Sequence, residues 1–157
     1  MKAIKAKDIM NKNVITISEN QSIVEACRIM NDNNTGFLPV LNKFDELSGV
    51  ITDRDIITRL ISKEKDIYLP VSSIMTSSII KCSKNDDLSH IITKMADSQI
   101  RRIIVSEKDK VIGIIGLYDL LKIDNIESEI CELLKEILLE YPAVTTLFKD
   151  ISMNTCI

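Results

Sequence analysis

Apolar residues recur along the first 123 positions in short blocks, some continuous and some at helical spacing. Continuous β-branched or apolar runs predict buried strands at 14–17, 37–41, 48–51, 79–82, 102–106 and 111–115. Apolar residues at i, i+3, i+4 and i+7 predict amphipathic helices at Ile23, Ala26, Cys27 and Met30 and at Leu88, Ile91, Ile92 and Met95. Further helices are predicted at 56–61 and 117–123. The order strand, helix, strand, strand, helix therefore occurs twice.

The two halves of this pattern are related by an internal repeat. A shift of 65 residues places Ile9-Met10 on Ile74-Met75. After one residue is dropped in a loop, a shift of 64 places Gly49 on Gly113, and surface loops tolerate such a change. We expect an α/β (α+β) fold of two β-α-β-β-α repeats, packed sheet against sheet as a pseudo-two-fold pair, because neither small repeat closes a good core alone.

The C-terminal part of the chain has no counterpart in the repeat. One apolar helical face is predicted there, which Pro142 ends, and its members are Ile126, Ile130, Leu133, Leu134, Ile137, Leu138 and Tyr141. We expect this face to pack on the repeats or across an oligomer interface. The predicted divisions are repeat 1 at 1–61, a linker at 62–72, repeat 2 at 73–123 and a helical extension at 124–157.

Composition narrows the class of protein. At 157 residues and 45% hydrophobic, the chain suits one compact globular unit. A net charge of −3 argues against a general nucleic-acid binder, whose affinity needs an excess of Lys and Arg. No apolar run approaches the roughly 20 residues of a membrane span, and no signal peptide is evident. With four cysteines and no C-x-x-C, we expect a cytoplasmic protein without disulfides.

Catalytic or metal-binding patterns are not found in the sequence. His90, the only histidine, is expected to be an exposed or half-buried helical residue. Cys27 and Cys82 fall at apolar positions, where a thiol acts as a small hydrophobe, and Cys131 and Cys156 lie in the C-terminal segment. No Cys or His spacing suits a metal, and no Gly-rich phosphate loop is present. We expect no catalytic residue, no metal and no required cofactor.

A strand-to-helix motif that occurs in both repeats is the strongest candidate for a binding site. Its copies are Gly49–Asp55 and Gly113–Asp119. Unpaired N–H groups at such a helix start favour an anion, and the final acid is able to hold ribose hydroxyls. Thr52 and the acid three residues later also have the spacing of a capping box, which alone explains the first copy. In the second copy Gly116 replaces the threonine, yet the acid is kept, so both interpretations remain open.

Basic residues lie beside both motifs. Arg101 and Arg102 lie just before the apolar strand run Ile103-Ile104-Val105, where they are either a solvated strand edge or a phosphate contact, since arginine binds phosphate through two hydrogen bonds. Arg54, beside the acid of the first motif, is a candidate for the same role.

These motifs, taken in order, resemble a cystathionine-β-synthase (CBS) domain. The residues that carry the resemblance are Ile9-Met10, Val14-Ile15-Thr16, Gly36-Phe37-Leu38-Pro39-Val40 and Gly49-Val50-Ile51-Thr52-Asp53-Arg54-Asp55. The second unit matches the same template. Two such units over about residues 4–123 resemble a CBS pair, or Bateman module, of the small stand-alone bacterial kind.

The resemblance implies a non-catalytic regulatory module that senses an adenine nucleotide (AMP, ADP or ATP) in clefts between the repeats and transmits its ligand state through a homodimer. By position, one cleft would combine Thr52, Asp55, Gly36 and Phe37 with Ile80 and Ile100, with Arg54 beside the acid. The other would combine Asp119, Arg101 and Arg102 with Ile15 and Thr35. An unidentified protein partner is also possible, whereas no nucleic acid or membrane is expected.

The sequence departs from the family pattern at two positions. Gly116 stands where a serine or threonine is usual, which weakens the expected ribose contact at Asp119, and Ile104 stands where proline is usual. The alternative function is a structural or oligomerisation protein with empty clefts, acting through its C-terminal helix.

Overall fold

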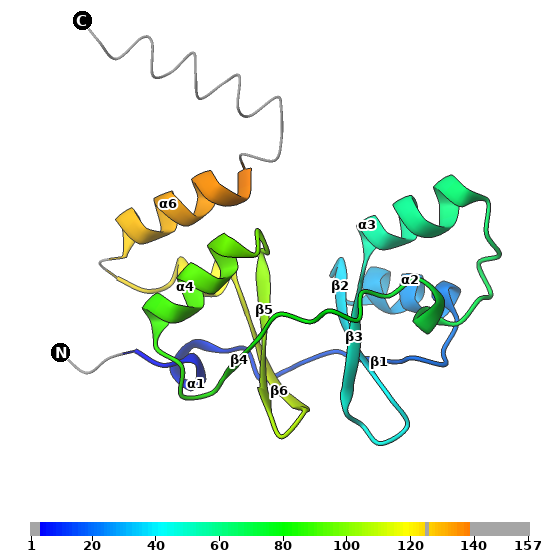
Figure 1. Cartoon of the computed structure of the whole chain (residues 1–157), viewed down its shortest axis with the longest axis horizontal. Coiled ribbons are helices and arrows are strands. Elements are labelled where there is room, and N and C mark those ends of the chain that lie inside the picture. Colours follow the sequence, from blue (N-terminus) through cyan, green and yellow to red (C-terminus); the bar gives the residue numbers. More distant parts are fainter. Residues whose placement is uncertain (1–3, 125, 139–157) are drawn as a thin grey trace, which may run out of the picture. The chain divides into compact units, whose positions relative to one another are not determined.

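The computed structural model describes residues 4–124 and 126–138, and only the backbone of Glu127, Glu129 and Leu138 (Figure 1). The chain forms two compact units. Unit 1 contains the described parts of Met1–Asn11, Cys82–Ile103 and Ile114–Ile157, and unit 2 contains Lys12–Lys81 and Ile104–Gly113. Within the described residues, no helix is both long and apolar enough to cross a membrane.

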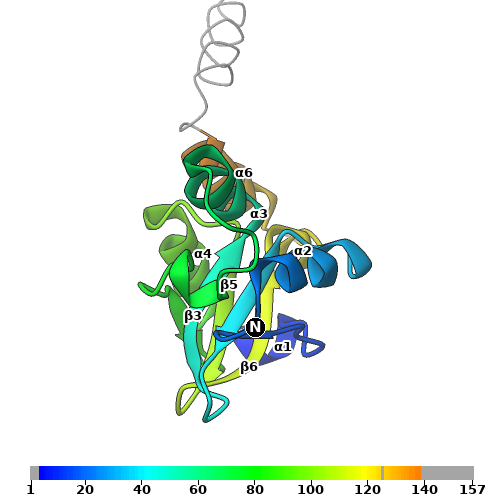
Figure 2. The same ribbon diagram turned by 90° about the vertical axis from the view of Figure 1, so that its right-hand side faces the viewer.

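A three-stranded sheet forms the centre of unit 2. Its strands β1 (Ile17–Ser18), β2 (Phe37–Leu41) and β3 (Leu47–Thr52) lie in that order, with β1 parallel and β3 antiparallel to β2. Helix α2 (Ile23–Asp32) makes the crossover from β1 to β2 and covers one face of the sheet (Figures 1 and 2). After β3 the chain passes into α3 (Asp53–Asp55), a π-helical turn (Ile56–Leu60) and a 3-10 turn (Ile61–Lys63). The core residues are Ile17, Ile23, Ala26, Met30, Leu38, Val40, Ile51, Ile56, Leu60, Val71 and Ile74.

A second three-stranded sheet follows the same plan. Its strands β4 (Lys81–Ser83), β5 (Arg102–Glu107) and β6 (Lys110–Gly116) lie in that order. The helices are α1 (Ala6–Ile9), α4 (Leu88–Asp97), α5 (Leu117–Leu120) and α6 (Glu127–Leu138). Buried apolar residues of unit 1 include Ala6, Cys82, Leu88, Ile91, Met95, Ile103, Ile115 and Leu120. The expected mixed α/β fold with two repeats and an added helix is confirmed.

Local sequence signals explain the main helices well. At the start of α2, Glu25 Oε2 accepts the backbone N–H of Ser22 at 2.9 Å, and Ser22 Oγ accepts the N–H of Glu25 at 3.3 Å. The hydrogen bond from the Ser22 backbone lowers the pKa of Glu25. The predicted apolar faces of α2 and α4 are buried, except that Ile92 is half-buried and Cys27 is exposed. Its position at the edge of the α2 stripe puts that thiol outside the core.

In unit 1, a segment from the start of the chain completes the fold. Ala6 donates its N–H to Asp86 O at 2.9 Å, and Ile4 O accepts the N–H of Leu88 at 2.9 Å. Residues of the first sequence repeat therefore close the unit that is built mainly from the second repeat.

In unit 2, the corresponding segment comes from the predicted linker. Val71 donates to Gln21 O at 2.8 Å, and Leu69 O accepts the N–H of Ile23 at 3.0 Å. These bonds match those of unit 1 after the shift of 65 residues. We call residues 69–76 the strap. The predicted linker is thus partly ordered structure, with a 3-10 turn at Val71–Ser73.

Three predicted elements are shorter or displaced in the structure. Only Ile17 of the strand expected at 14–17 is in β1, because pairing with β2 occurs only at Ile17 and Ser18. Before that strand, Val14 donates to Lys12 O in a turn. The strand expected at 79–82 begins at Lys81, and the helix expected at 117–123 ends after Leu120.

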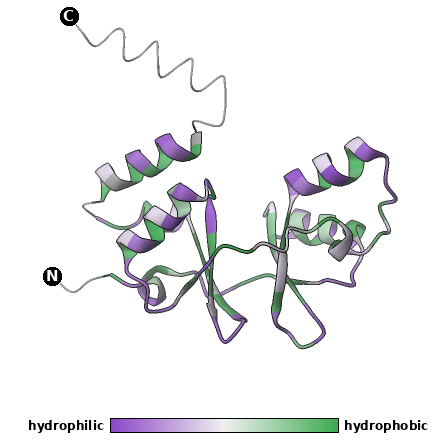
Figure 3. Cartoon of the chain, in the orientation of Figure 1, coloured by the Kyte–Doolittle hydropathy of each residue, from purple (hydrophilic) through white to green (hydrophobic). Residues whose placement is uncertain are grey.

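Helix α6 packs against α4 in unit 1. Ile130, Leu133 and Ile137 are buried, and Figure 3 shows the hydrophobic side of α6 turned towards α4. This is the first of the two packing arrangements that the sequence predicts for the helix. The predicted helical residue Tyr141 and the stop at Pro142 lie outside the described residues.

Leu133→Ala should lower the free energy of unfolding by about 2–5 kcal/mol, because the substitution leaves a cavity where α6 meets α4. Urea unfolding measures the change. Glu132→Ala, at an exposed position of the same helix, is the control and should stay within about 0.5 kcal/mol of the wild type. Equal, small effects of both substitutions would contradict the burial of this helix face.

Candidate functional site

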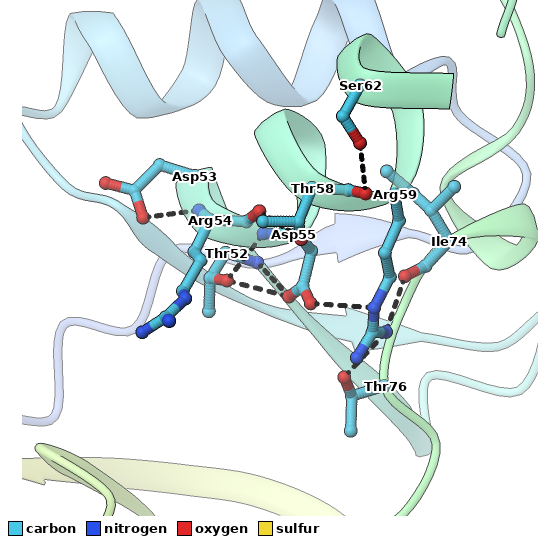
Figure 4. A network of polar contacts seen from close by, with 9 residues as sticks. All are labelled: Thr52, Asp53, Arg54, Asp55, Thr58, Arg59, Ser62, Ile74 and Thr76. Carbon is cyan, nitrogen blue, oxygen red and sulfur yellow. Dashed lines mark hydrogen bonds and ion pairs between the residues drawn. The ribbon is translucent and has the colours of Figure 1, made fainter. Parts of the chain in front are cut away.

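The first motif lies in unit 2, where β3 ends and α3 begins (Figure 4). Asp55 turns back towards the strand, and its Oδ2 accepts the backbone N–H of Thr52 at 2.9 Å and the Thr52 hydroxyl at 2.7 Å. Thr52 Oγ1 also lies 3.1 Å from the donating N–H of Asp55. The capping box is therefore present. It leaves Asp55 only 8% exposed, which makes its carboxylate a fixed and largely buried acceptor.

Arg59 holds the other oxygen of this carboxylate. Its Nε lies 3.3 Å from Asp55 Oδ1, while its Nη1 donates to Ile74 O at 2.9 Å and to Thr76 Oγ1 at 3.0 Å. The arginine thus ties the acid to the strap. A carboxylate has about four acceptor positions, so these contacts leave Asp55 able to take a further donor at Oδ1.

A second carboxylate of the motif lies over Gly36. Asp53 donates its N–H to Gly36 O at 3.1 Å, and a Cβ atom on Gly36 would lie 2.5 Å from Asp53 Oδ2. Asp53 Oδ1 accepts the N–H of Arg54 at 2.7 Å. In Figure 4 the Arg54 guanidinium points away from the carboxylates of Asp53 and Asp55. The side-chain space at Gly36 is therefore filled by an acid.

The second motif, in unit 1, forms only one of the two reciprocal hydrogen bonds of a capping box. Asp119 Oδ2 accepts the backbone N–H of Gly116 at 2.9 Å, and Lys122 Nζ lies 3.3 Å from Oδ1. The acid is therefore explained by capping even without the threonine, so its presence alone does not indicate a ligand. The missing hydroxyl also leaves Oδ2 with one hydrogen bond fewer than its counterpart has. The weaker ribose contact expected at Asp119 from the loss of the hydroxyl stays a prediction.

The two arginines border this second motif. Arg101 O accepts the N–H of Leu117 at 3.2 Å, and Arg102 Cγ would lie 3.6 Å from a Cβ atom on Gly116. Both arginines are exposed. Unit 1 thus brings together the acid Asp119 and the basic pair, as the sequence predicts.

The remaining predicted site residues are divided between the units. Phe37, Thr35 and Ile80 lie in unit 2, where Thr35 Oγ1 accepts the N–H of Phe37 at 3.4 Å. Ile15 also lies in unit 2, whereas Ile100 lies in unit 1. The grouping of Ile100 with the first motif, and of Ile15 and Thr35 with the second, stays a prediction.

Other reactive side chains are placed as follows. Cys82 is buried, and burial raises the pKa of its thiol to about 11, so the thiol stays protonated at neutral pH. His90 is exposed on α4, while Cys27 and Cys131 are exposed thiols. Cys156 lies outside the described residues. Among residues 4–124 and 126–138, no group of His, Cys, Asp and Glu is arranged to hold a metal ion.

The sequence analysis did not identify two residues that contribute to the first motif. Arg59 has the i, i+4 spacing from Asp55 that marks a helical ion pair, so this contact had a usable signal. The bonds of Arg59 to Ile74 and Thr76 had no signal in the sequence, because they depend on how the strap folds back. Asp53 lies between the two capping positions of the motif, and the sequence analysis gave it no role.

Gly116→Ser should raise the free energy of unfolding by a few tenths to about 1 kcal/mol, because it supplies the missing capping hydroxyl. The backbone there is extended, with φ of −111°, and the nearest atoms to an added Cβ are 3.6 Å away. Gly49→Ser is the contrasting variant. Its Cβ would lie 2.6 Å from Met75 Sδ, so it should destabilise. Urea unfolding of both variants checks this, and a similar loss in each would refute the cap assignment.

Comparisons with known proteins agree with this geometry. The family model for the CBS domain matches residues 6–62 and 71–125. The CBS domain-containing protein YhcV of Bacillus subtilis is 37% identical over 114 residues, which cover 73% of this chain and 81% of the relative. Two such matches in tandem account for most of the described chain.

Solved structures show the same arrangement of elements. An uncharacterized conserved protein from Pyrococcus horikoshii superposes with a TM-score of 0.70 at 35% identity, covering 78% of this chain and 92% of that one. The CBS domain pair of protein MJ0100, crystallised with 5′-methylthioadenosine and S-adenosyl-L-methionine, gives a TM-score of 0.69 at 29% identity, with coverage of 76% and 94%. The two strand-to-helix motifs, the doubled fold and these matches together show that the chain belongs to the CBS domain family, with two CBS domains in tandem.

Proposed function

We propose that this protein is a regulatory module that binds an adenosine-containing ligand of the AMP, ADP or ATP class at its strand-to-helix motifs and catalyses no reaction. The observation that carries the proposal is that the carboxylates of Asp55 and Asp119 are both held in place and both keep acceptor positions beyond those that the capping bonds use. Each is anchored by the backbone N–H that it caps, at 2.9 Å. The similar CBS domain pair of MJ0100 was crystallised with two adenosine derivatives, which supports an adenosine-containing ligand in general and leaves the AMP, ADP or ATP class as the finer part of the proposal.

Ribose hydroxyls suit these carboxylates chemically. An ionised carboxylate is an acceptor only, and two neighbouring hydroxyls are donors that share one such group. Hydrogen bonds to a charged acceptor are the stronger kind. The cap holds each carboxylate in place before a ligand arrives, so binding loses little side-chain entropy there.

Cations suited to phosphate lie at the second motif. Arg102 lies beside Gly116, and Lys122 reaches Asp119. Arginine and lysine both bind phosphate, the former through paired hydrogen bonds. This combination of one acid and several cations favours a nucleotide over a nucleoside in unit 1.

Asp55→Ala should weaken ligand binding at the first motif by about 10- to 150-fold, because it removes hydrogen bonds to a charged acceptor. Thr52→Ala should weaken ligand binding by a smaller factor. Calorimetric titration measures the affinities, after a thermal-shift screen of AMP, ADP, ATP, NAD and S-adenosylmethionine identifies the ligand, since a ligand of the folded state raises its stability.

If Asp55 only caps the helix and binds no ligand, the same variant should behave differently. Asp55→Ala would then lose about 0.5–2 kcal/mol of stability with no ligand affinity to lose. Asp55→Asn is the matched control, because its amide oxygen still accepts the capping N–H while the charge is gone. If no adenosine compound binds the wild type, the ligand-binding function is refuted.

A homodimer is the proposed means by which ligand state is transmitted. Ile57 and Ile61, at i and i+4, are 61% and 56% exposed in unit 2, and Tyr118 and Leu121 are 73% and 62% exposed in unit 1. Large apolar side chains exposed in such groups are typical of an interface. A two-fold dimer would cover each group with a copy of the same chain.

Sedimentation at micromolar concentration should show a dimer, and Ile57→Lys combined with Ile61→Lys should dissociate it, because two charges would enter an apolar interface. Phe44→Ser removes another exposed apolar residue, 63% exposed in the β2–β3 hairpin, and should leave the dimer intact. A wild-type monomer of 17.7 kDa would contradict the proposal.

A further inference from the structure

The helical segment that follows each strand-to-helix motif exposes apolar side chains at equivalent positions. The shift of 64 residues places Ile57 on Leu121, and these side chains are 61% and 62% exposed. The turns that precede them also match, because Asp55 and Asp119 each accept the backbone N–H of the last strand residue at 2.9 Å. Each unit therefore presents an aliphatic side chain of the same exposure at the same place.

The residue that stands three positions before this aliphatic side chain differs between the units. The same shift places Arg54 on Tyr118, so unit 2 has a cation where unit 1 has an aromatic ring. Residues three apart on a helix are neighbours on its surface. We call Arg54, Ile57 and Ile61 the unit 2 patch, and Tyr118 and Leu121 the unit 1 patch. All five side chains are exposed.

The charge of Arg54 is available to a partner. The backbone N–H of Arg54 bonds to Asp53 Oδ1, but Figure 4 shows the guanidinium directed away from the carboxylates of Asp53 and Asp55. Within the part of the chain that the structure describes, the guanidinium forms no hydrogen bond or ion pair. An interface that covers the neighbouring isoleucines must therefore offer this cation a favourable contact.

The ring of Tyr118 is a surface that attracts cations. Lys122 Nζ already lies 4.3 Å from the ring centroid, and its charge is offset by Asp119 Oδ1 at 3.3 Å. Because Tyr118 is 73% exposed, the ring keeps surface for a second cation. The two patches are thus complementary to each other: one has an unpaired guanidinium beside aliphatic residues, and the other has an open ring beside one.

We infer that the homodimer pairs unlike units, so that the unit 2 patch of one copy docks on the unit 1 patch of the second copy. The pairing rests on the homodimer of the proposed function and names the surfaces that meet in it. A two-fold axis that places unit 2 on the second copy's unit 1 also places unit 1 on the second copy's unit 2. Two equal contacts therefore close the dimer.

The alternative is a dimer in which each unit meets its own copy. Such a dimer would bring two Arg54 guanidiniums into one apolar contact, and like charges across an interface oppose association. Pairing of unlike units instead lays Arg54 on the Tyr118 ring as a cation–π contact. Ile57 and Leu121 fit either arrangement, so the choice depends on the residue before them.

The first experiment mixes two full-length variants, Ile57→Lys and Leu121→Glu. If unlike units pair, each variant alone has a lone charge in both contacts, and its dimer dissociation constant should rise at least about tenfold. An equimolar mixture should restore the dimer, because the mixed dimer has one native contact and one lysine–glutamate pair. Sedimentation at matched total concentration measures the dimer fraction, and melting temperatures check that both variants fold.

Pairing of like units gives a different result in the same experiment. Each variant alone would keep one native contact, and the mixed dimer would have a lone charge in both contacts, so mixing would not restore dimerisation. That result would overturn the pairing of unlike units and leave the homodimer intact. A wild-type monomer, or undiminished dimerisation of both separate variants, would overturn the pairing together with the homodimer at these surfaces.

The second experiment tests the contact between Arg54 and the ring. Arg54→Ala should raise the dimer dissociation constant by about 5- to 30-fold, because it removes one cation–π contact from each half of the interface. The same substitution should have little effect in a Tyr118→Ala background and its full effect in a Tyr118→Phe background, which keeps the ring. Lys43→Ala, which removes a cation from the Phe44 ring in the β2–β3 hairpin, should leave the dimer unchanged. A tighter dimer on Arg54→Ala, or equal effects in both backgrounds, would contradict the pairing of unlike units.

Discussion

One hydrogen bond recurs where each repeat turns from strand to helix: a carboxylate accepts the backbone N–H of the last strand residue at 2.9 Å, at Thr52 and again at Gly116. This bond fixes where the helix starts and where the carboxylate lies. Buried N–H groups require a partner, so the acid is needed for folding whether or not a ligand binds. Under the proposed function, stability and ligand binding depend on the same carboxylate oxygens, so a substitution there changes both.

The duplicated fold uses this turn in two different ways. In unit 2 the cap is complete, and Arg59 links its acid to the strap, so the carboxylate is held from both sides. In unit 1 the cap lacks its hydroxyl, and Asp119 Oδ2 accepts only the backbone N–H of Gly116. The glycine in place of threonine thus leaves the helix start in unit 1 with one capping hydrogen bond in place of two.

Local signals in the sequence were enough to predict much of the fold. The apolar stripes of α2 and α4 depend on spacing over a few residues, and the repeat is found by direct comparison of the two halves. The strap was taken as part of a linker, because its bonds at Leu69 and Val71 join residues about 45–50 positions away. The bonds of Arg59 to the strap and the approach of Asp53 to Gly36 were missed for a related reason: both depend on tertiary neighbours, whereas only the Asp55–Arg59 pair has a spacing that the sequence reveals.

A crystal structure of the wild-type protein with saturating 5′-methylthioadenosine or AMP tests the account most directly. We expect ribose hydroxyls within hydrogen-bond distance of the Asp55 or Asp119 carboxylate, with the capping bond to Thr52 or Gly116 still in place. A ligand bound elsewhere, with neither carboxylate in contact with the sugar, would contradict the account and leave both acids with a purely structural role.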